Sequence, residues 1–140
     1  MNFKISMLLG ILLVAASCIS PEKLLNKSSS QKIFFGKYGG FTNIPVEYVL
    51  LNNRFLFKIE DQKYIRTAKI QSKQSEEIQS YIKAAGLPGL QLNEPGNMTY
   101  YIRIQSEGTD REIKWTDQSQ YPEVWKLYKA LNSLVNPTKQ

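Results

Sequence analysis

The sequence predicts an α+β fold, a two-layer structure in which about five or six antiparallel strands form a sheet and two amphipathic helices cover one face of it. Several segments alternate apolar and polar residues with a period of two, as half-buried strands do. Two other segments carry apolar residues at helical spacing. The predicted order is strands, a helix, a strand hairpin and a second helix, which is typical of helices packed on an antiparallel sheet.

The first group of strands is expected between residues 32 and 70. It opens with "KIFFGKYGGF" (residues 32–41), a strand followed by a glycine-rich turn. Residues 46–50 and 55–60 alternate in side-chain character, and Asn52-Asn53 and Asp61-Gln62 are turn signals that bound them. These segments predict a meander of short antiparallel strands.

The first helix is predicted within "SKQSEEIQSYIKAAGLPG", residues 72–89. Its apolar stripe consists of Ile78, Tyr81, Ile82 and Ala85. Ser72 or Ser75 is expected to cap its start, and Gly86 followed by Pro88 is expected to end it.

The second helix is predicted within "YPEVWKLYKALNSLVNP", residues 121–137, with Pro122 in its first turn. Its apolar stripe consists of Val124, Leu127, Tyr128, Leu131 and Leu134. We expect Trp115 and Trp125 to belong to the core, since each lies on or beside an apolar stripe.

A second hairpin is predicted between the two helices, within residues 97–117. Tyr100, Ile102, Ile104, Ile113 and Trp115 should face one way, with Glu107–Asp110 as the turn. The opposite face should project Tyr101, Arg103 and Lys114 into water. Tyrosine and arginine are favoured at binding hot spots, so these three residues are the candidate partner-binding surface. Ordinary cross-strand pairing on an exposed sheet is the alternative interpretation.

Composition limits the chemistry that the chain can perform. The chain has 140 residues, no histidine and one cysteine, so the commonest general base and metal ligand are missing. We predict no catalytic residue, no metal site and no cofactor. A carboxylate-based enzyme is the least favoured alternative, and its acids would come from Glu60, Asp61, Glu76, Glu77, Asp110 and Glu112. The net charge of +6 comes from scattered basic residues, which are typical of a solvated surface.

A phosphate-binding loop is the other chemical motif to consider, at "GKYGGF", residues 36–41. The glycines lack the Walker spacing, and no helix is expected to follow them. We therefore expect a turn in which Gly39 or Gly40 adopts a positive φ.

The first 17 residues have the layout of a secretory signal peptide. Lys4 supplies a positive charge, residues 5–14 form an apolar run, and small residues precede Cys18. The run is too short for a transmembrane anchor, which needs about 20 residues. The alternative that this apolar run is a buried helix of the core is disfavoured by the polar sequence that follows the run.

Residues 15–18, "AASC", resemble the lipobox of bacterial lipoproteins, with Ala15 where leucine is commoner. The resemblance implies that a diacylglycerol is attached to the Cys18 thiol, that the chain is cut before Cys18, and that the new N-terminus is acylated, for example with palmitate. Two or more acyl chains anchor a protein stably to a membrane. The alternative is an ordinary signal peptide cut near Ala16 or Ser17, which leaves a free or intermolecularly paired thiol.

Ile19 and Ser20 follow Cys18 in place of the aspartate that retains lipoproteins at the inner membrane, so the resemblance implies an outer-membrane anchor facing the periplasm. Residues 18–31 are expected to be the lipidated cysteine and a flexible tether without a helix, and residues 32–137 a single domain. Export argues against a nucleic-acid partner despite the positive charge.

Two stretches of the domain, "GGFTNIPVEYVL" and "PGNMTYYIRI", precede a tryptophan-bearing strand and a "LYKAL" helix. Together they resemble small uncharacterised lipoproteins of the Bacteroidota, a resemblance that implies an α+β domain and no known ligand. We predict a lipid-anchored, non-catalytic binding or accessory module of the cell envelope that contacts an envelope protein or polymer. A carrier of a small hydrophobic ligand, enclosed among aromatic side chains, is the alternative.

Overall fold

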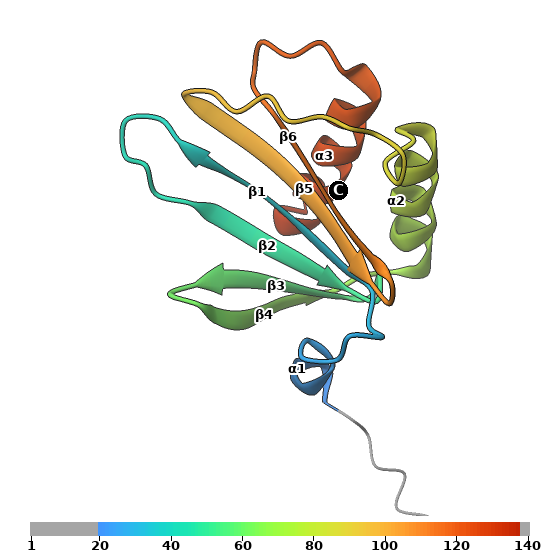
Figure 1. Ribbon diagram of the computed structural model, residues 1–140. Helices are drawn as coiled ribbons and strands as arrows, with labels where there is room; N and C mark the ends of the chain where they lie inside the picture. The colour runs from blue at the N-terminus through green and yellow to red at the C-terminus, as the bar shows by residue number, and fades with distance from the viewer. Residues whose placement is uncertain (1–19, 138–140) are drawn as a thin grey trace, which may run out of the picture.

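The computed structural model describes residues 20–137 of the chain. The predicted signal peptide, the lipobox and Cys18 lie outside the described residues. Within residues 20–137, six strands form one open antiparallel sheet accompanied by three helices, so the predicted α+β class is confirmed (Figure 1).

The sheet has the strand order β4-β3-β2-β1-β5-β6. Its strands are β1 (Lys32–Gly39), β2 (Val46–Leu51), β3 (Phe55–Glu60), β4 (Lys63–Lys69), β5 (Met98–Ser106) and β6 (Thr109–Trp115). The first four strands form a meander in chain order. After β4 the chain passes through a helix and returns as β5 along the free edge of β1, which makes β1 a central strand.

The turns of the meander have the left-handed backbone that the sequence signals require. Asp61 and Gln62 have φ values of 48° and 62°, which is the geometry of a two-residue turn between antiparallel strands. Asn52 and Asn53 have φ values of 48° and 52°. Asparagine tolerates this region better than most residues, because its short polar side chain can bond to the local backbone.

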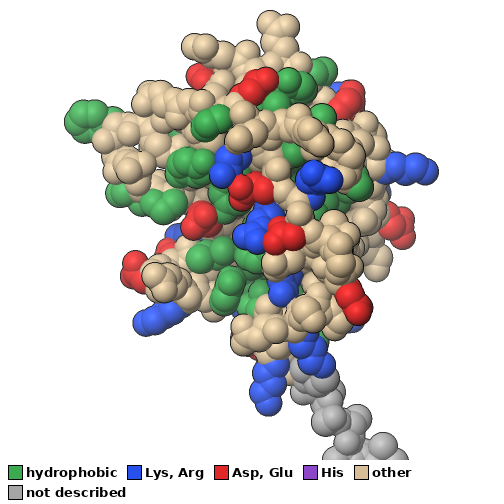
Figure 2. All heavy atoms as spheres, in the orientation of Figure 1, with side chains coloured by type: hydrophobic (Ala, Val, Ile, Leu, Met, Phe, Trp, Pro, Cys, Tyr) green, Lys and Arg blue, Asp and Glu red, His purple; other side chains and the backbone are tan. Residues whose placement is uncertain are grey.

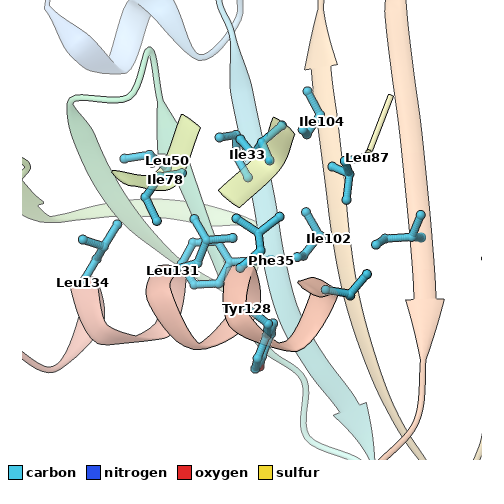
Figure 3. Close-up of a cluster of buried hydrophobic side chains, with 14 of the residues drawn as sticks. Ile33, Phe35, Leu50, Ile78, Leu87, Ile102, Ile104, Tyr128, Leu131 and Leu134 are labelled. Carbon is cyan, nitrogen blue, oxygen red and sulfur yellow. The ribbon is translucent and has the colours of Figure 1, made fainter. Parts of the chain in front are cut away.

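The larger hydrophobic core joins one face of the sheet to the helices α2 (Ser72–Ala84) and α3 (Pro122–Val135). We call this face of the sheet the core face. Its buried strand residues are Ile33, Phe35, Leu50, Leu56, Ile102, Ile104, Ile113 and Trp115. Figure 3 shows several of these side chains converging with residues of α2 and α3. All five residues predicted as the stripe of the last helix are buried.

The start of α2 differs from the prediction. Gln71, and neither Ser72 nor Ser75, precedes the first helical residue, and its backbone N–H donates to the side chain of Gln74 at 3.1 Å. The amide side chain of Gln74 thereby satisfies the backbone N–H of the residue before the helix, whereas a serine cap would have accepted from an N–H inside the first turn. The end of α2 is as predicted, since Gly86 follows with φ 61°.

Four aromatic side chains meet where α3 packs against β5 and β6. The rings of Tyr100, Trp115, Trp125 and Tyr128 lie with centroids 4.8–6.1 Å apart, mostly edge to face. Trp115 is fully buried and Trp125 is half-buried. Burial raises the pKa of Tyr128 to about 12.

A short helix lies where no helix was expected. The segment α1 (Pro21–Leu24) begins with a proline in its first turn, and Leu25 after it is buried. Leu25 packs with Val49, Leu51 and Phe57 in a second, smaller cluster on the sheet face opposite the core face. The alternation within each hairpin predicts a sheet with one covered face and one wet face. The prediction is wrong at this end, because apolar side chains from the N-terminal segment cover the strands.

Candidate functional site

One row of residues crosses five strands on the face opposite the core face, which we call the groove face. Ile59, Glu47, Gly36, Tyr101 and Lys114 are direct register partners in the consecutive strands β3, β2, β1, β5 and β6. Direct partners on antiparallel strands share a face, so the register brings residues up to 78 positions apart in the printed sequence onto one surface.

A groove lies along this row, and every member of the row except Gly36 lines it. It has a volume of about 320 Å³ and is lined by Phe34, Tyr38, Glu47, Ile59, Tyr101, Arg103, Glu112 and Lys114. Figure 2 shows this face of the molecule, with a band of basic and acidic side chains beside apolar ones. Gly36 itself is buried, because the ring of Tyr101 lies over it and forms part of the groove wall.

Gly36 also permits a contact between β5 and β2. A Cβ atom at Gly36 would lie 3.2 Å from Cε1 of Tyr101 and 2.2 Å from the carbonyl oxygen of Val46, so a larger residue would not fit. The Tyr101 hydroxyl donates to Oε1 of Glu47 at 2.7 Å. The side chain of Tyr101 therefore spans the central strand above its glycine.

Tyr101 is a protonated hydrogen-bond donor at neutral pH. Burial, and then the hydrogen bond and charge of Glu47, raise the pKa of Tyr101 well above its ordinary value of 10.0. Its phenol consequently holds one oxygen of the Glu47 carboxylate. Among residues 20–137, Glu47 forms no ion pair with a lysine or arginine.

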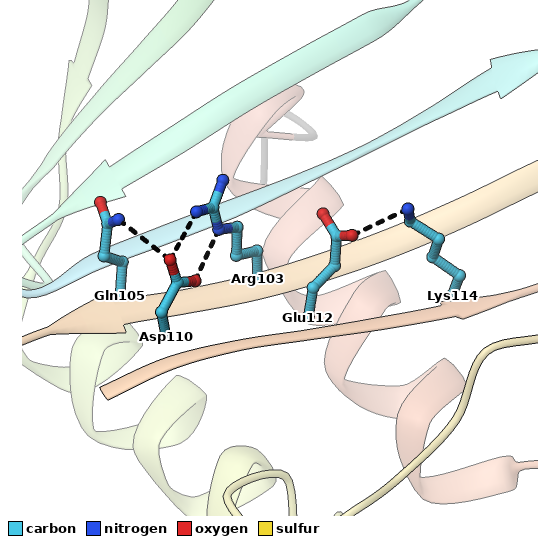
Figure 4. Close-up of polar contacts among 5 residues, drawn as sticks. All are labelled: Arg103, Gln105, Asp110, Glu112 and Lys114. Carbon is cyan, nitrogen blue, oxygen red and sulfur yellow. Dashed lines mark hydrogen bonds and ion pairs between the residues drawn. The ribbon is translucent and has the colours of Figure 1, made fainter. Parts of the chain in front are cut away.

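The two cations of the groove are both paired, as Figure 4 shows. Arg103 donates through Nε to Oδ1 of Asp110 at 2.7 Å and through Nη2 to Oδ2 at 2.5 Å. Lys114 Nζ lies 2.8 Å from Oε1 of Glu112. The hydrogen bond from Arg103 lowers the pKa of Asp110, and the hydrogen bond to Glu112 raises the pKa of Lys114. The charge of each cation is neutralised by its own acid. Glu47 is therefore the groove residue whose charge has no oppositely charged partner among residues 20–137.

The three residues predicted as a partner-binding surface all line this groove. Arg103 and Lys114 are partly exposed there, as expected. Tyr101 differs, because its side chain is buried with 7% exposed rather than projecting into water. It lies on the predicted face but folds over Gly36, which removes it from solvent.

Sequence reasoning missed Glu47 and Gly36 as parts of the site. Glu47 was one polar residue of an alternating strand, and Gly36 was one of several glycines near a turn. Their role depends on β1 lying between β2 and β5, and local alternation does not indicate which strands are neighbours. A lone glycine inside a strand pattern was the available signal, since it often marks a close approach.

The acids that a carboxylate enzyme would need are dispersed. Glu60 pairs with Lys58, and Glu77 accepts a hydrogen bond from the Tyr81 hydroxyl at 3.3 Å. Arg103 lowers the pKa of Asp110, whereas a general acid working near neutral pH needs a raised one.

The glycine-rich segment 36–41 forms the end of β1 and the start of the turn that follows it. Gly39 and Gly40 have φ values of 98° and 71°, and β2 follows them, so no helix start lies at the loop. The expectation of positive φ at these glycines is confirmed. At the tip, Phe41 and Ile44 are exposed.

A larger hollow of about 740 Å³ lies between the β2–β3 turn and the start of α2. Its amides bond to one another or to neighbouring residues: Asn53 donates to Gln31 at 2.8 Å and accepts from Gln79 at 2.9 Å. The two hydrogen bonds of Asn53 therefore connect the residue before β1, the β2–β3 turn and α2, which is a structural role.

Two further properties concern residues 20–137 alone. No helix there has the length and apolar character needed to cross a bilayer. No group of three or more Cys, Asp or Glu side chains in that range is arranged to hold a metal ion.

No protein-family model matches the chain, and no curated protein is significantly similar to it.

Proposed function

We propose that this protein is a lipid-anchored, non-catalytic binding module of the cell envelope, which contacts an envelope protein or polymer through the groove on its sheet. The observation that carries the proposal is the groove itself. It combines an apolar wall with fixed polar groups, the usual composition of a recognition site. Its residues come from five strands, which hold them rigidly.

We infer that α2 and α3 cover the core face alone, in the predicted order of strands, helix, hairpin and helix. The shared cluster of buried residues from both helices supports this arrangement. The groove face is then free for a partner over β1, β5 and β6, while Leu24 and Leu25 pack against its other end.

The binding proposal is tested by affinity capture from the envelope of the host, with the full chain carrying Cys18→Ser as bait. We expect the double variant Arg103→Ala/Lys114→Ala to lose a partner that the bait retains. Tyr101→Ala/Arg103→Ala should lose the same partner. The matched control is Lys63→Ala/Arg66→Ala on the edge strand β4, which removes the same charge outside the groove. Identical partner sets for groove and control variants would contradict the proposed surface.

The anchor is proposed from the lipobox-like residues 15–18, because two acyl chains on Cys18 would hold the domain at a membrane. Mass analysis of the mature protein from its host should show a chain that begins at Cys18 and carries acyl chains. Cys18→Ser should abolish the lipid and release the protein from the membrane fraction. A mature N-terminus elsewhere, or an unmodified thiol, would overturn the anchor.

Location at the outer membrane, facing the periplasm, is proposed from the Ile19-Ser20 pair after Cys18. Separation of inner and outer membranes should find the protein in the outer fraction. A protease added to intact cells should leave the domain uncut. Digestion of the domain in intact cells would instead indicate display at the surface.

The alternative, a carrier of a small hydrophobic ligand, has less support. Tyr100, Trp115, Trp125 and Tyr128 contact one another between the sheet and α3 and occupy the space that a ligand would need. Native mass spectrometry of protein purified from its host tests this alternative. A retained apolar molecule would favour the carrier over the groove.

A further inference from the structure

We propose that the groove recognises a lysine side chain of a partner protein, with Glu47 as the counter-ion of the lysine ammonium. This inference rests on the proposed binding function and names the chemistry that the groove would take. The argument begins with charge, because Arg103 and Lys114 are already paired with acids while Glu47, among residues 20–137, bonds only to a phenol.

The surroundings of Glu47 suit an organic cation. Tyr38 and Tyr101 have ring centroids 6.2 Å apart at an interplanar angle of 46°, and both line the groove together with Phe34. Aromatic faces attract cations, and the attraction grows where water is excluded. The methylene stem of a lysine is apolar and would lie against these rings and Ile59.

The carboxylate geometry favours lysine over arginine. The Tyr101 hydroxyl already donates to Oε1 of Glu47, so a two-pronged donor would have to share that oxygen, whereas a single-point donor can use Oε2 alone. Arginine binds a carboxylate best through two parallel hydrogen bonds, one to each oxygen. An ammonium is a compact point charge that a single oxygen can serve, so a primary ammonium matches the available acceptor better.

The same charge balance favours a lysine side chain over a phospholipid headgroup as the ligand of the groove. Phosphoethanolamine carries an ammonium and a phosphate close together, so it needs an unpaired cation beside Glu47. Asp110 and Glu112 already neutralise the two cations of the groove. A cation without a neighbouring anion, as at the end of a lysine side chain, therefore fits best.

The experiment measures binding of small probes to the full Cys18→Ser chain by NMR, following the ring protons of Tyr38 and Tyr101. The probes are Nα-acetyl-lysine methylamide, its norleucine counterpart, which has the same alkyl chain without the ammonium, and O-phosphoethanolamine. We expect saturable shifts with the lysine probe and binding of the norleucine probe weaker by roughly two- to fivefold. Glu47→Gln should weaken the lysine probe similarly, while Glu60→Gln on the β3–β4 hairpin should leave it unchanged.

No saturable shift with the lysine probe, equal binding of the norleucine probe, or unchanged binding to Glu47→Gln would each overturn the lysine assignment. Tighter binding of O-phosphoethanolamine would replace the lysine with a lipid headgroup. Affinity capture separates this failure from failure of the binding function. A partner lost with Arg103→Ala/Lys114→Ala but kept with Glu47→Gln would leave the binding proposal standing without lysine recognition.

Discussion

Gly36 shapes the groove through the absence of a side chain. Its position at the centre of the sheet lets the Tyr101 ring cross β1 and reach Glu47. Glycine normally weakens a strand, because it loses more conformational entropy than other residues and contributes no packing. Here the contact of Tyr101 with Glu47 across the glycine offsets part of that cost.

Gly36→Ala should lower the free energy of unfolding by about 1–3 kcal/mol, the usual effect of overpacking. The added Cβ would lie 2.2 Å from a backbone oxygen, which cannot move without shifting β2. Denaturant unfolding measures the change. Gly89→Ala is the control, because its Cβ would have no neighbour closer than 3.9 Å. Equal stability of the two variants would show that the strands at Gly36 can separate at little cost.

Tyr101 should make the protein sensitive to alkali. Its folded-state pKa is raised, so the stability that results is present below pH 10.0, the ordinary pKa of tyrosine, and is lost as the pH rises through the folded-state value. Between about pH 9 and 12, Tyr101→Phe should therefore lose less free energy of unfolding than the unaltered protein. Denaturant unfolding across this range measures the difference. Parallel curves for Tyr101→Phe and the unaltered protein would contradict the raised pKa.

At the scale of elements, the chain uses its N-terminal segment differently from the prediction. The sequence 18–31 was expected to be a flexible tether, yet α1 and Leu25 pack on the sheet. Apolar Leu24 and Leu25 were visible in the sequence, but two apolar residues do not indicate which surface they cover. If Cys18 is the anchor, the free tether is shorter than 14 residues, and the domain lies closer to the membrane.

The β3–β4 turn carries avoidable backbone strain. Gln62 has φ 62°, in the left-handed region that costs most residues roughly 1–2 kcal/mol and costs glycine little. Gln62→Gly should raise the free energy of unfolding by about 0.5–1 kcal/mol after the entropy of the unfolded chain is included. Thermal unfolding measures the gain. Lys63→Gly, one residue later in β4, should instead lower stability, and a loss in both variants would contradict the turn assignment.

At the scale of the whole molecule, both faces of the sheet bury hydrophobic side chains that stabilise the fold. The core face carries the larger cluster, and Val49, Leu51 and Phe57 on the groove face are also buried. Alternation in β2 and β3 therefore does not separate apolar from polar residues. It separates two apolar sets that belong to different clusters.

Phe57→Ala should cost about 3–5 kcal/mol of unfolding free energy, the range for a buried phenylalanine. Phe41→Ala should change it by less than about 0.5 kcal/mol, because Phe41 is exposed at a loop tip. Denaturant unfolding compares the two. Similar small effects would show that the second cluster contributes little to the fold.

The sequence by itself determined the α+β class, the stripe of α3 and the turns at Asp61-Gln62 and Gly39-Gly40, because these features depend on residues close together along the chain. It also placed Tyr101, Arg103 and Lys114 on one face of a hairpin. The tertiary structure decided that β1 lies between β2 and β5, and with it the site. Only this pairing sets Glu47, Gly36 and Tyr101 in one row, since strand neighbours are chosen by the packing of the whole sheet.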